Sequence, residues 1–469
     1  MKSANKVVFS GIWYTISNFM IKGMVFLTVP IFARLMDKSQ FGDYSNYTTW
    51  LHLLMVIVSF NLYASVNRAR LDYPQQLDAY CSSILLFGTI ITAGFYFFIY
   101  LNLPIFEKIF SVDRFYIHLM FSYLLVQPAL EVFQIKQTVL YQYKANVAVG
   151  ITSTFLTTAV SVLLVLFMED KLKGRVIGYL FPLIFLNIII YGYFIIKGRC
   201  FRLSYCKYAL LYSWPFVPHL LANYILSASD RIMITNLCGN EFTATYTIAC
   251  NCMSIATLFL TSLNNAVSPW IFDKLENNEE KDINKITYPY CLIFFLSVQL
   301  VMLVGPELLW ILGGPQYSNS KSIIIPLLVS AVLQFAYCLY VNIEQYSRKT
   351  WAIAMGTAIA ASVNIGLNFI LLPIYGYWIA AYTTLIGYII LFLVHYSFVR
   401  IIGYKNIYND KIVFFMILAS ILEQPLILLL YSHILIRYII FLSVVLSITL
   451  LFFAKKDKIK RLLRKEDDY

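Results

Sequence analysis

The chain has 469 residues, of which 60% are hydrophobic and only 13% are charged. An ordinary soluble domain has roughly 45–50% apolar and about 25% charged residues, so this composition excludes a soluble globular protein. The net charge of +12 does not indicate nucleic acid as a partner, because Lys and Arg accumulate in the cytoplasmic loops of proteins that cross a bilayer many times. The lipid bilayer is therefore the expected environment.

Apolar runs recur along the whole chain and are separated by short segments rich in charged residues, Pro, Gly or Asn. A membrane-spanning helix needs about 20 apolar residues, and the runs have that length. We therefore predict an all-α, polytopic membrane protein with about 14 transmembrane helices. The predicted spans are approximately residues 8–32, 42–66, 81–101, 117–136, 147–167, 176–196, 211–234, 243–268, 288–311, 323–344, 352–372, 377–399, 412–431 and 438–454.

Basic residues are distributed unevenly between the two sides that alternate along these spans. Most Lys and Arg residues fall on the side that holds both termini. Because positively charged loops remain in the cytoplasm, we predict a multi-pass protein of the cell (inner, cytoplasmic) membrane with both termini cytoplasmic.

The two halves of the chain are weakly similar to each other. Phe41–Tyr44 resembles Phe242–Tyr246 at an offset of 201 residues, and Gly174–Gly178 resembles Gly376–Ala380 at an offset of 202. Transporters are often built from such internal repeats. The similar offsets predict two parallel six-helix bundles around a central cavity.

The repeat also predicts the organisation of the chain into domains. An N-terminal six-helix bundle is expected at residues 1–200 and a C-terminal six-helix bundle at 201–402. Two additional transmembrane helices are expected at 403–454, followed by a basic cytoplasmic tail at 455–469.

Polar side chains form stripes on three of the predicted spans. In hydrocarbon a polar side chain is tolerated mainly where it faces protein or a water-filled cavity, so the stripes mark the interior. Spacings of three and four residues place the members of each stripe on one helical face. The candidates for lining a substrate cavity, on or beside these stripes, are Thr15, Asn18 and Lys22 in the first span, Gln127 and Glu131 in the fourth, and His219, Asn223, Ser227, Asp230 and Arg231 in the seventh.

The charged members of these stripes allow more than one interpretation. An ammonium near mid-membrane costs about 2.5 kcal/mol or more, so Lys22 either meets a ligand or pairs with an acid such as Glu131. Asp230 and Arg231 lie near the outer end of their span, where interface snorkelling or a local ion pair explains them as well as ligand binding does. Glu131 and Glu423 are candidates for carrying a coupling proton, with neutral packing as the alternative.

Signals of enzymes and cofactor-binding proteins are absent from the sequence. It contains no Gly-rich phosphate loop, nucleophile elbow or HExxH motif, and the longest predicted external loop, residues 102–116, is too short for a catalytic domain. The eight cysteines form no CxxC pair or His/Cys cluster, which favours core packing over disulfides or metal ligation. We expect no catalytic residues, no metal and no cofactor.

Three pairs of segments carry recognisable motifs. They are Pro30–Met36 with Phe41–Ser45, Ser229–Ile234 with Ala244–Thr247, and Asn368–Gly376 with Ala380–Thr384. Together they resemble the polysaccharide translocase group, the Wzx type, of the multidrug/oligosaccharidyl-lipid/polysaccharide exporter superfamily. The resemblance covers roughly residues 5–400.

This resemblance implies a flippase rather than an enzyme. Such a protein would move polyprenyl-pyrophosphate-linked oligosaccharide repeat units from the inner to the outer leaflet, by alternating access, for O-antigen, capsule or exopolysaccharide biosynthesis. A polysaccharide polymerase and chain-length proteins are then candidate partners. The alternatives are a cation-coupled multidrug antiporter of the same superfamily and a membrane scaffold of a polysaccharide-assembly complex.

Overall fold

The computed structural model describes residues 20, 21, 23, 24, 26–447 and 449, and all regular secondary structure within them is helical. This confirms the predicted all-α class. The predicted cavity residues Thr15, Asn18 and Lys22 lie outside the described residues.

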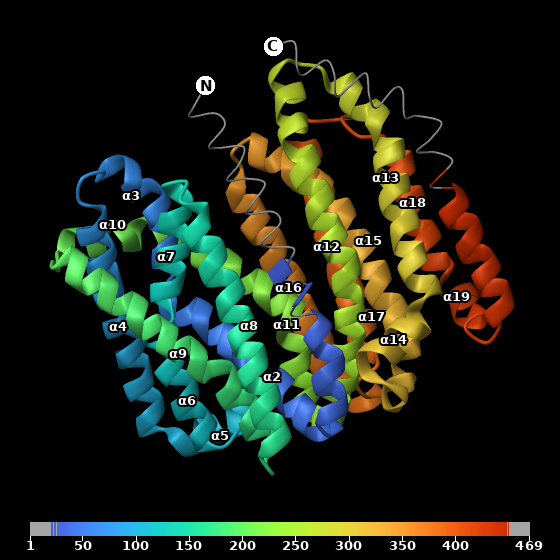
Figure 1. Cartoon of the computed structure of the whole chain (residues 1–469). Helices are drawn as coiled ribbons and strands as arrows, with labels where there is room; N and C mark the ends of the chain where they lie inside the picture. Colours follow the sequence, from blue (N-terminus) through green and yellow to red (C-terminus); the bar gives the residue numbers. More distant parts are fainter. Residues whose placement is uncertain (1–19, 22, 25, 448, 450–469) are drawn as a thin grey trace. The chain divides into compact units, whose positions relative to one another are not determined.

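The helices follow one another with short connections (Figure 1). A short apolar helix, Phe26–Leu35, comes first and another, Ile434–Ser447, comes last among the described residues. Between them lie α2 Lys38–Ser59, η1 Leu62–Ser65, α3 Val66–Asp72, α4 Leu77–Leu101, α5 Leu103–Phe110, α6 Arg114–Leu124, α7 Pro128–Val139, α8 Tyr143–Phe167, α9 Lys171–Gly198, α10 Leu203–Ser213, η2 Trp214–Phe216, α11 Val217–Leu237, α12 Asn240–Glu276, α13 Glu280–Leu303, α14 Gly305–Gly313, η3 Pro315–Ser320, α15 Lys321–Tyr346, α16 Thr350–Tyr375, α17 Ile379–Ile401, α18 Asp410–Leu422 and α19 Gln424–Leu430, where η marks a 3-10 helix.

The described residues contain nine helices that are long and apolar enough to cross a membrane, or up to eleven if each of two bent pairs is one span. The protein is therefore a multi-pass membrane protein. Each of the predicted apolar runs overlaps a helix, while the total of about 14 spans stays a prediction. The helix α11 has 21 residues, which is enough to span, but it is not among the nine because it is too polar.

Two predicted spans, 42–66 and 412–431, are bent where the helix is interrupted. The helix α2 ends at Phe60 and Asn61, which both have left-handed backbone angles with φ of 47° and 52°, and the chain continues at an angle of 51°. The helices α18 and α19 meet at 45°, where Pro425 lies in the first turn of α19. Proline interrupts a helix because it has no N–H group and its ring clashes with the preceding turn.

The chain divides into two compact units. Unit 1 comprises Met1–Thr247 and Asn368–Tyr377, and unit 2 comprises Ile248–Leu367 and Trp378–Tyr469. The bundle boundaries expected near residues 200 and 402 stay predictions.

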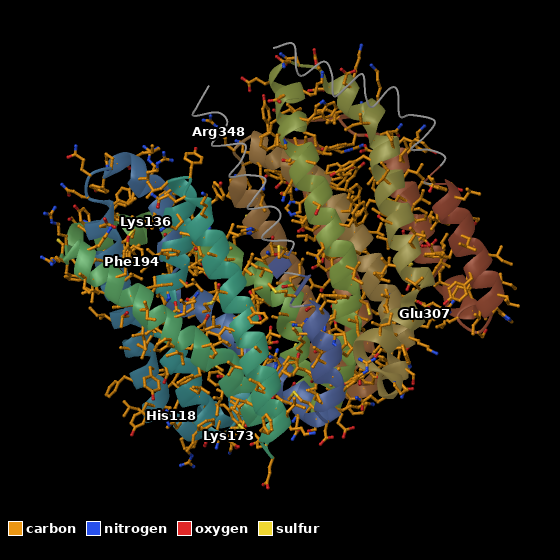
Figure 2. All side chains as sticks on the ribbon, in the orientation of Figure 1. His118, Lys136, Lys173, Phe194, Glu307 and Arg348 are labelled. Carbon is orange, nitrogen blue, oxygen red and sulfur yellow. The ribbon has the colours of Figure 1, made fainter. Side chains whose placement is uncertain are left out.

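Unit 1 contains a partly buried ion pair between α4 and α7. The Lys136 ammonium contacts the Asp78 carboxylate, and the Lys136 side chain is only 8% exposed. It also lies 5.2 Å from the centre of the Phe194 ring of α9 (Figure 2). The carboxylate and the negative face of the ring together compensate for the loss of water around the ammonium.

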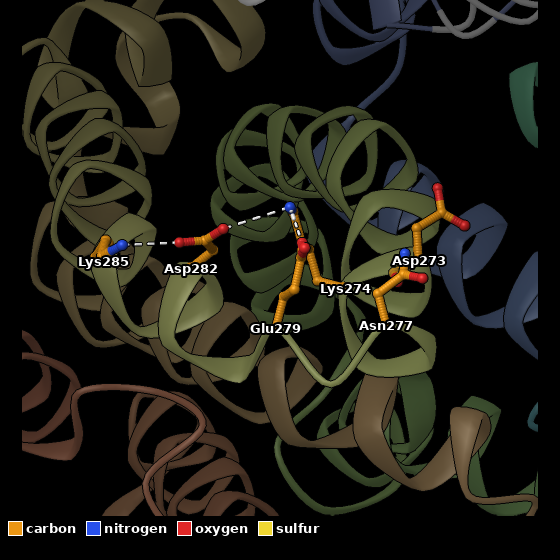
Figure 3. Close-up of polar contacts among 6 residues, drawn as sticks. All are labelled: Asp273, Lys274, Asn277, Glu279, Asp282 and Lys285. Atoms are coloured by element: carbon orange, nitrogen blue, oxygen red, sulfur yellow. Dashed lines mark hydrogen bonds and ion pairs between the residues drawn. The ribbon is translucent and has the colours of Figure 1, made fainter. Parts of the chain in front are cut away.

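Unit 2 is organised around α15. In the span that contains this helix, Pro315–Tyr346, 78% of the apolar stretch is buried. The α15 helix packs against α13, α17 and α18. Figure 1 shows that the axes of these helices run in roughly the same direction. The α12–α13 connection carries a chain of ion pairs (Figure 3), in which Lys274 contacts Glu279 and also Asp282 at 3.4 Å, while Lys285 contacts Asp282 at 2.8 Å. These charges close a polar turn between two apolar helices.

Candidate functional site

The helix α11 of unit 1 presents a polar face. His219, Asn223 and Ser227 are spaced by four residues, so they follow one side of the helix. Asn223 and Ser227 are exposed and His219 is half-buried. The Ser227 hydroxyl donates a hydrogen bond to the Tyr224 carbonyl of its own helix, at 3.0 Å. It therefore does not need a hydrogen-bond acceptor on a neighbouring helix. This face can therefore bind water or a polar ligand.

Arg231 lies one turn beyond Ser227 on the same side and supplies a positive charge. Its side chain is half-buried, and its charge lies close enough to act electrostatically on both His52 of α2 and Tyr224 of α11. The rings of His52 and Tyr224 are 6.4 Å apart. The sequence does not predict a role for either ring, because nothing in it shows that α2 packs along α11.

Backbone hydrogen bonds fix the orientation of both rings beside Arg231. The His52 Nδ1 atom lies 2.7 Å from the Thr48 carbonyl oxygen. Because a carbonyl only accepts, Nδ1 must carry the proton and donate it. The Tyr224 hydroxyl donates to the Thr49 carbonyl at 3.1 Å. In a neutral ring with this tautomer, Nε2 is the acceptor nitrogen.

Asp230 is adjacent to Arg231 in sequence but has a different environment. Its side chain is only 2% exposed. The Tyr246 hydroxyl donates to its Oδ2 atom and the Asn368 amide donates to its Oδ1 atom, both at 2.6 Å. Because a buried carboxylate is costly unless it is hydrogen-bonded, this arrangement indicates that Asp230 positions α11 inside unit 1 rather than meeting solvent at a membrane interface.

Gln127 and Glu131, the predicted cavity residues of the fourth span, pair with each other. The span is interrupted before Pro128, the first residue of α7. Gln127 is 2% exposed and its amide donates to the Glu131 carboxylate at 3.2 Å. The neighbouring Leu130 N–H group donates to Asn187 of α9 at 3.0 Å. The side chains of Gln127 and Glu131 thus bond to each other, while the contact with α9 is made by the neighbouring backbone of Leu130.

A second cation of unit 1, Arg175, stacks between aromatic rings, which the sequence does not predict. Its guanidinium carbon lies 3.5 Å from the centre of the Phe32 ring and 4.6 Å from that of Tyr44. Gly174 allows this placement, because a Cβ atom there would lie 2.9 Å from the Leu164 carbonyl oxygen and would push α9 away from α8. Phe32 and Tyr44 both belong to the motif segments near the start of the chain.

The described residues contain no group of three or more His, Cys, Asp or Glu side chains that could hold a metal ion. The site of unit 1 is therefore described by its polar face, its cations and its aromatic rings.

Comparison with a family model decides the classification of the chain. The model described as "Polysaccharide biosynthesis protein" matches residues 7–275, which is more than half of the sequence. The chain belongs to the polysaccharide biosynthesis protein family. Its polar face on α11 and the aromatic residues around Arg175 lie within the matched residues.

Two proteins of Haemophilus influenzae are similar to this family member in sequence. One, described as an uncharacterized membrane protein, is 25% identical over 377 residues, which cover 75% of this chain and 87% of the relative. The other, described as Lsg locus putative protein 1, is 22% identical over 380 residues, which cover 77% of this chain and 90% of the relative. The similarity thus extends over most of both relatives.

Solved structures share the fold of this family member. The lipid II flippase MurJ, in an inward closed conformation, aligns with a TM-score of 0.71 and 15% identity over 96% of this chain and all of that chain. An inward-facing multidrug resistance transporter of the MATE family, a member of the MOP superfamily, aligns with a TM-score of 0.55 and 13% identity over 83% of this chain and 98% of that chain. These likenesses show the fold.

Proposed function

We propose that this protein moves polyprenyl-pyrophosphate-linked oligosaccharide repeat units from the inner to the outer leaflet of the cytoplasmic membrane by alternating access. The product would supply O-antigen, capsule or exopolysaccharide biosynthesis. The observation that carries the proposal is the exposed polar face of α11, with Ser227 one turn and Asn223 two turns from Arg231. The family and the MurJ-like fold support it.

The chemistry of a lipid-linked oligosaccharide suits such a face. Sugar hydroxyls cannot enter hydrocarbon without losing their hydrogen bonds to water, so they need polar side chains along the path. The amide of Asn223 can donate and accept, and the hydroxyl of Ser227 can do the same. The Arg231 guanidinium can bind a pyrophosphate through paired N–H groups. The polyprenyl chain can remain in the lipid throughout.

The topology and the partners belong to the same proposal. Both termini would lie in the cytoplasm, where the lipid-linked repeat is made, and a polysaccharide polymerase with chain-length proteins would use the repeat after translocation. No catalytic group is needed in the flippase itself. Lys22 stays a candidate for a second contact with the anionic head group.

The test is depletion of the protein in its host, with lipid-linked repeats and surface polysaccharide measured in the same cells. We expect repeats to accumulate in the cytoplasmic leaflet and surface polymer to disappear. Wild-type protein should restore export, whereas Arg231→Gln should restore about a tenth or less. Normal surface polymer without trapped repeats, in a host with no second translocase, would exclude the proposal. A changed drug susceptibility in that case would favour an antiporter.

A further inference from the structure

Unit 2 contains a cavity at the end where α13, α14 and η3 lead into α15. Its volume is about 580 Å³, which lies within the usual range of roughly 300–1,000 Å³ for ligand sites. Its lining comes from α14, η3, the first residue of α15 and the chain that follows α19. Glu307, one of the lining residues, is labelled in Figure 2. Short helices and turns make up most of this lining, which indicates a connection between spans at a membrane boundary.

Three charged side chains line the cavity: Arg437, Lys321 and Glu307. Arg437 is 2% exposed and contacts the Glu307 carboxylate through Nη2. Its Nε and Nη1 atoms have no hydrogen-bond partner among the described residues. Glu307 also accepts a hydrogen bond from the Tyr438 hydroxyl at 3.0 Å. The Glu307 carboxylate therefore accepts from two donors, whereas the Nε and Nη1 N–H groups of Arg437 can still donate to a ligand.

The charge of this lining is not balanced. Lys321 is exposed and has no hydrogen-bond or ion-pair partner among the described residues. Glu307 neutralises one of the two cations, which leaves one net positive charge in the cavity. A phosphodiester carries one negative charge and has oxygen acceptors that suit a guanidinium and an ammonium.

The edge of the cavity is apolar. Trp310 is 61% exposed, Ile311 is 49% exposed and Ile434 is 58% exposed, and all three line the cavity. Tryptophan favours the headgroup level of a bilayer, where one part of the ring is in contact with lipid and the other with water. A free anion would leave these apolar side chains uncovered, whereas a lipid would cover them with its chains.

We propose that this cavity binds the phosphate group of an anionic lipid, whose chains lie over Trp310, Ile311 and Ile434. Arg437 and Lys321 contact the phosphate, and Glu307 holds the guanidinium in place. The cavity shares no lining residue with the polar face of α11, and its occupation does not require transport.

The test measures thermal unfolding of the purified full chain in a neutral detergent, titrated with short-chain phosphatidylglycerol, short-chain phosphatidylcholine or inorganic phosphate. We expect phosphatidylglycerol to raise Tm more than phosphatidylcholine does, because the choline cation is repelled by Lys321. Inorganic phosphate should have little effect. Equal shifts from the two lipids would overturn the charge recognition, and an equal shift from inorganic phosphate would assign the cavity to a free anion.

Matched variants connect the effect to this cavity. Lys321→Gln changes an exposed side chain, so the fold should persist while the apparent Kd for phosphatidylglycerol rises about fivefold, as expected for one partly solvated charge pair. Lys281→Gln is the control, because this exposed lysine lies in the first turn of α13, at the opposite end of that helix from the cavity. Arg437→Lys keeps the charge beside Glu307 but removes the unused donors, and it should also weaken binding. An unchanged Kd in Lys321→Gln would overturn the proposal.

Discussion

The Asn368 amide donates a hydrogen bond of 2.6 Å to the Asp230 carboxylate across 138 positions of sequence. The second carboxylate oxygen accepts from the Tyr246 hydroxyl at the same distance. Asp230 and Tyr246 come from two motif segments that are neighbours in the chain, and Asn368 comes from a third, distant one. The structure therefore gives these motifs a common role, which is to hold one buried carboxylate.

Replacing Asn368 by Leu should destabilise unit 1. The substitution removes one hydrogen-bond donor, the one to Oδ1, from a buried carboxylate, which costs about 1–3 kcal/mol. Tyr246→Phe removes the donor to Oδ2 and should cost a similar amount. Thermal unfolding in detergent measures both, with Tyr212→Phe as the control because that ring is exposed. An Asn368→Leu protein as stable as the wild type would show that Asp230 is held by other contacts.

Gly42, near the start of α2, lies too close to another backbone segment to carry a side chain. A Cβ atom on Gly42 would lie 1.8 Å from the Asn240 carbonyl oxygen, whereas a Cβ atom on Gly94 of α4 would meet nothing within 4 Å. Gly42→Ala must therefore separate two backbones and should cost at least about 3 kcal/mol. Gly94→Ala should be neutral or stabilising by about 0.5–1 kcal/mol, because alanine favours a helix. The amount of folded protein in size-exclusion chromatography distinguishes these outcomes, and equal yields would contradict the close approach.

The helices could be located from the sequence because membrane spans are a local property. Twenty apolar residues identify a span without any knowledge of its neighbours. The ends were less predictable: α12 continues to Glu276, beyond the predicted end at residue 268, because a helix does not have to stop where its side chains become polar. The α12 helix ends only near Asn278, which has a left-handed φ of 55°.

The contacts within the site could not be read from the sequence, because they join distant segments. The weak repeat gave one partial indication: the Ser45 and Thr247 hydroxyls hydrogen-bond at 2.6 Å, and these residues are 202 positions apart, close to the offset between the repeats. No spacing rule places Arg175 over Phe32, since the helices that carry them are separated by more than a hundred residues. Such pairs depend on tertiary packing, which an alignment of related sequences would help to find.

Removing the acid of the Lys136–Asp78 pair should destabilise the junction of α4 and α7. Asp78→Asn leaves an ammonium that is 8% exposed without its carboxylate. Because Asp78 is itself 41% exposed, solvent screens part of the loss, and a cost of about 1–2 kcal/mol is expected. Glu169→Gln, on an exposed residue of the α8–α9 connection, is the control. Urea unfolding followed by tryptophan fluorescence should separate the two variants, and coincident curves would show that the aromatic rings alone hold Lys136.

Ser227 and Ser443 form a matched pair for testing the polar face of α11. Both are exposed, and each donates only to a carbonyl of its own helix among the hydrogen bonds of the described residues, Ser227 to Tyr224 at 3.0 Å and Ser443 to Ile440 at 2.7 Å. Replacement by Leu therefore removes no contact to another helix in either case, so both variants should fold and reach the membrane normally.

The two leucine variants should nevertheless differ in transport. Ser443 has Leu442 and Leu446 beside it, which are 63% and 59% exposed, so an added leucine there suits a lipid-facing surface. Ser227 lies between Asn223 and Arg231, where a leucine would displace water that a sugar needs along its path. Surface polysaccharide per unit of membrane protein should fall about tenfold in Ser227→Leu and stay at the wild-type level in Ser443→Leu. If both variants export normally, the polar face of α11 does not lie on the substrate path, and Arg231 loses its proposed role with it.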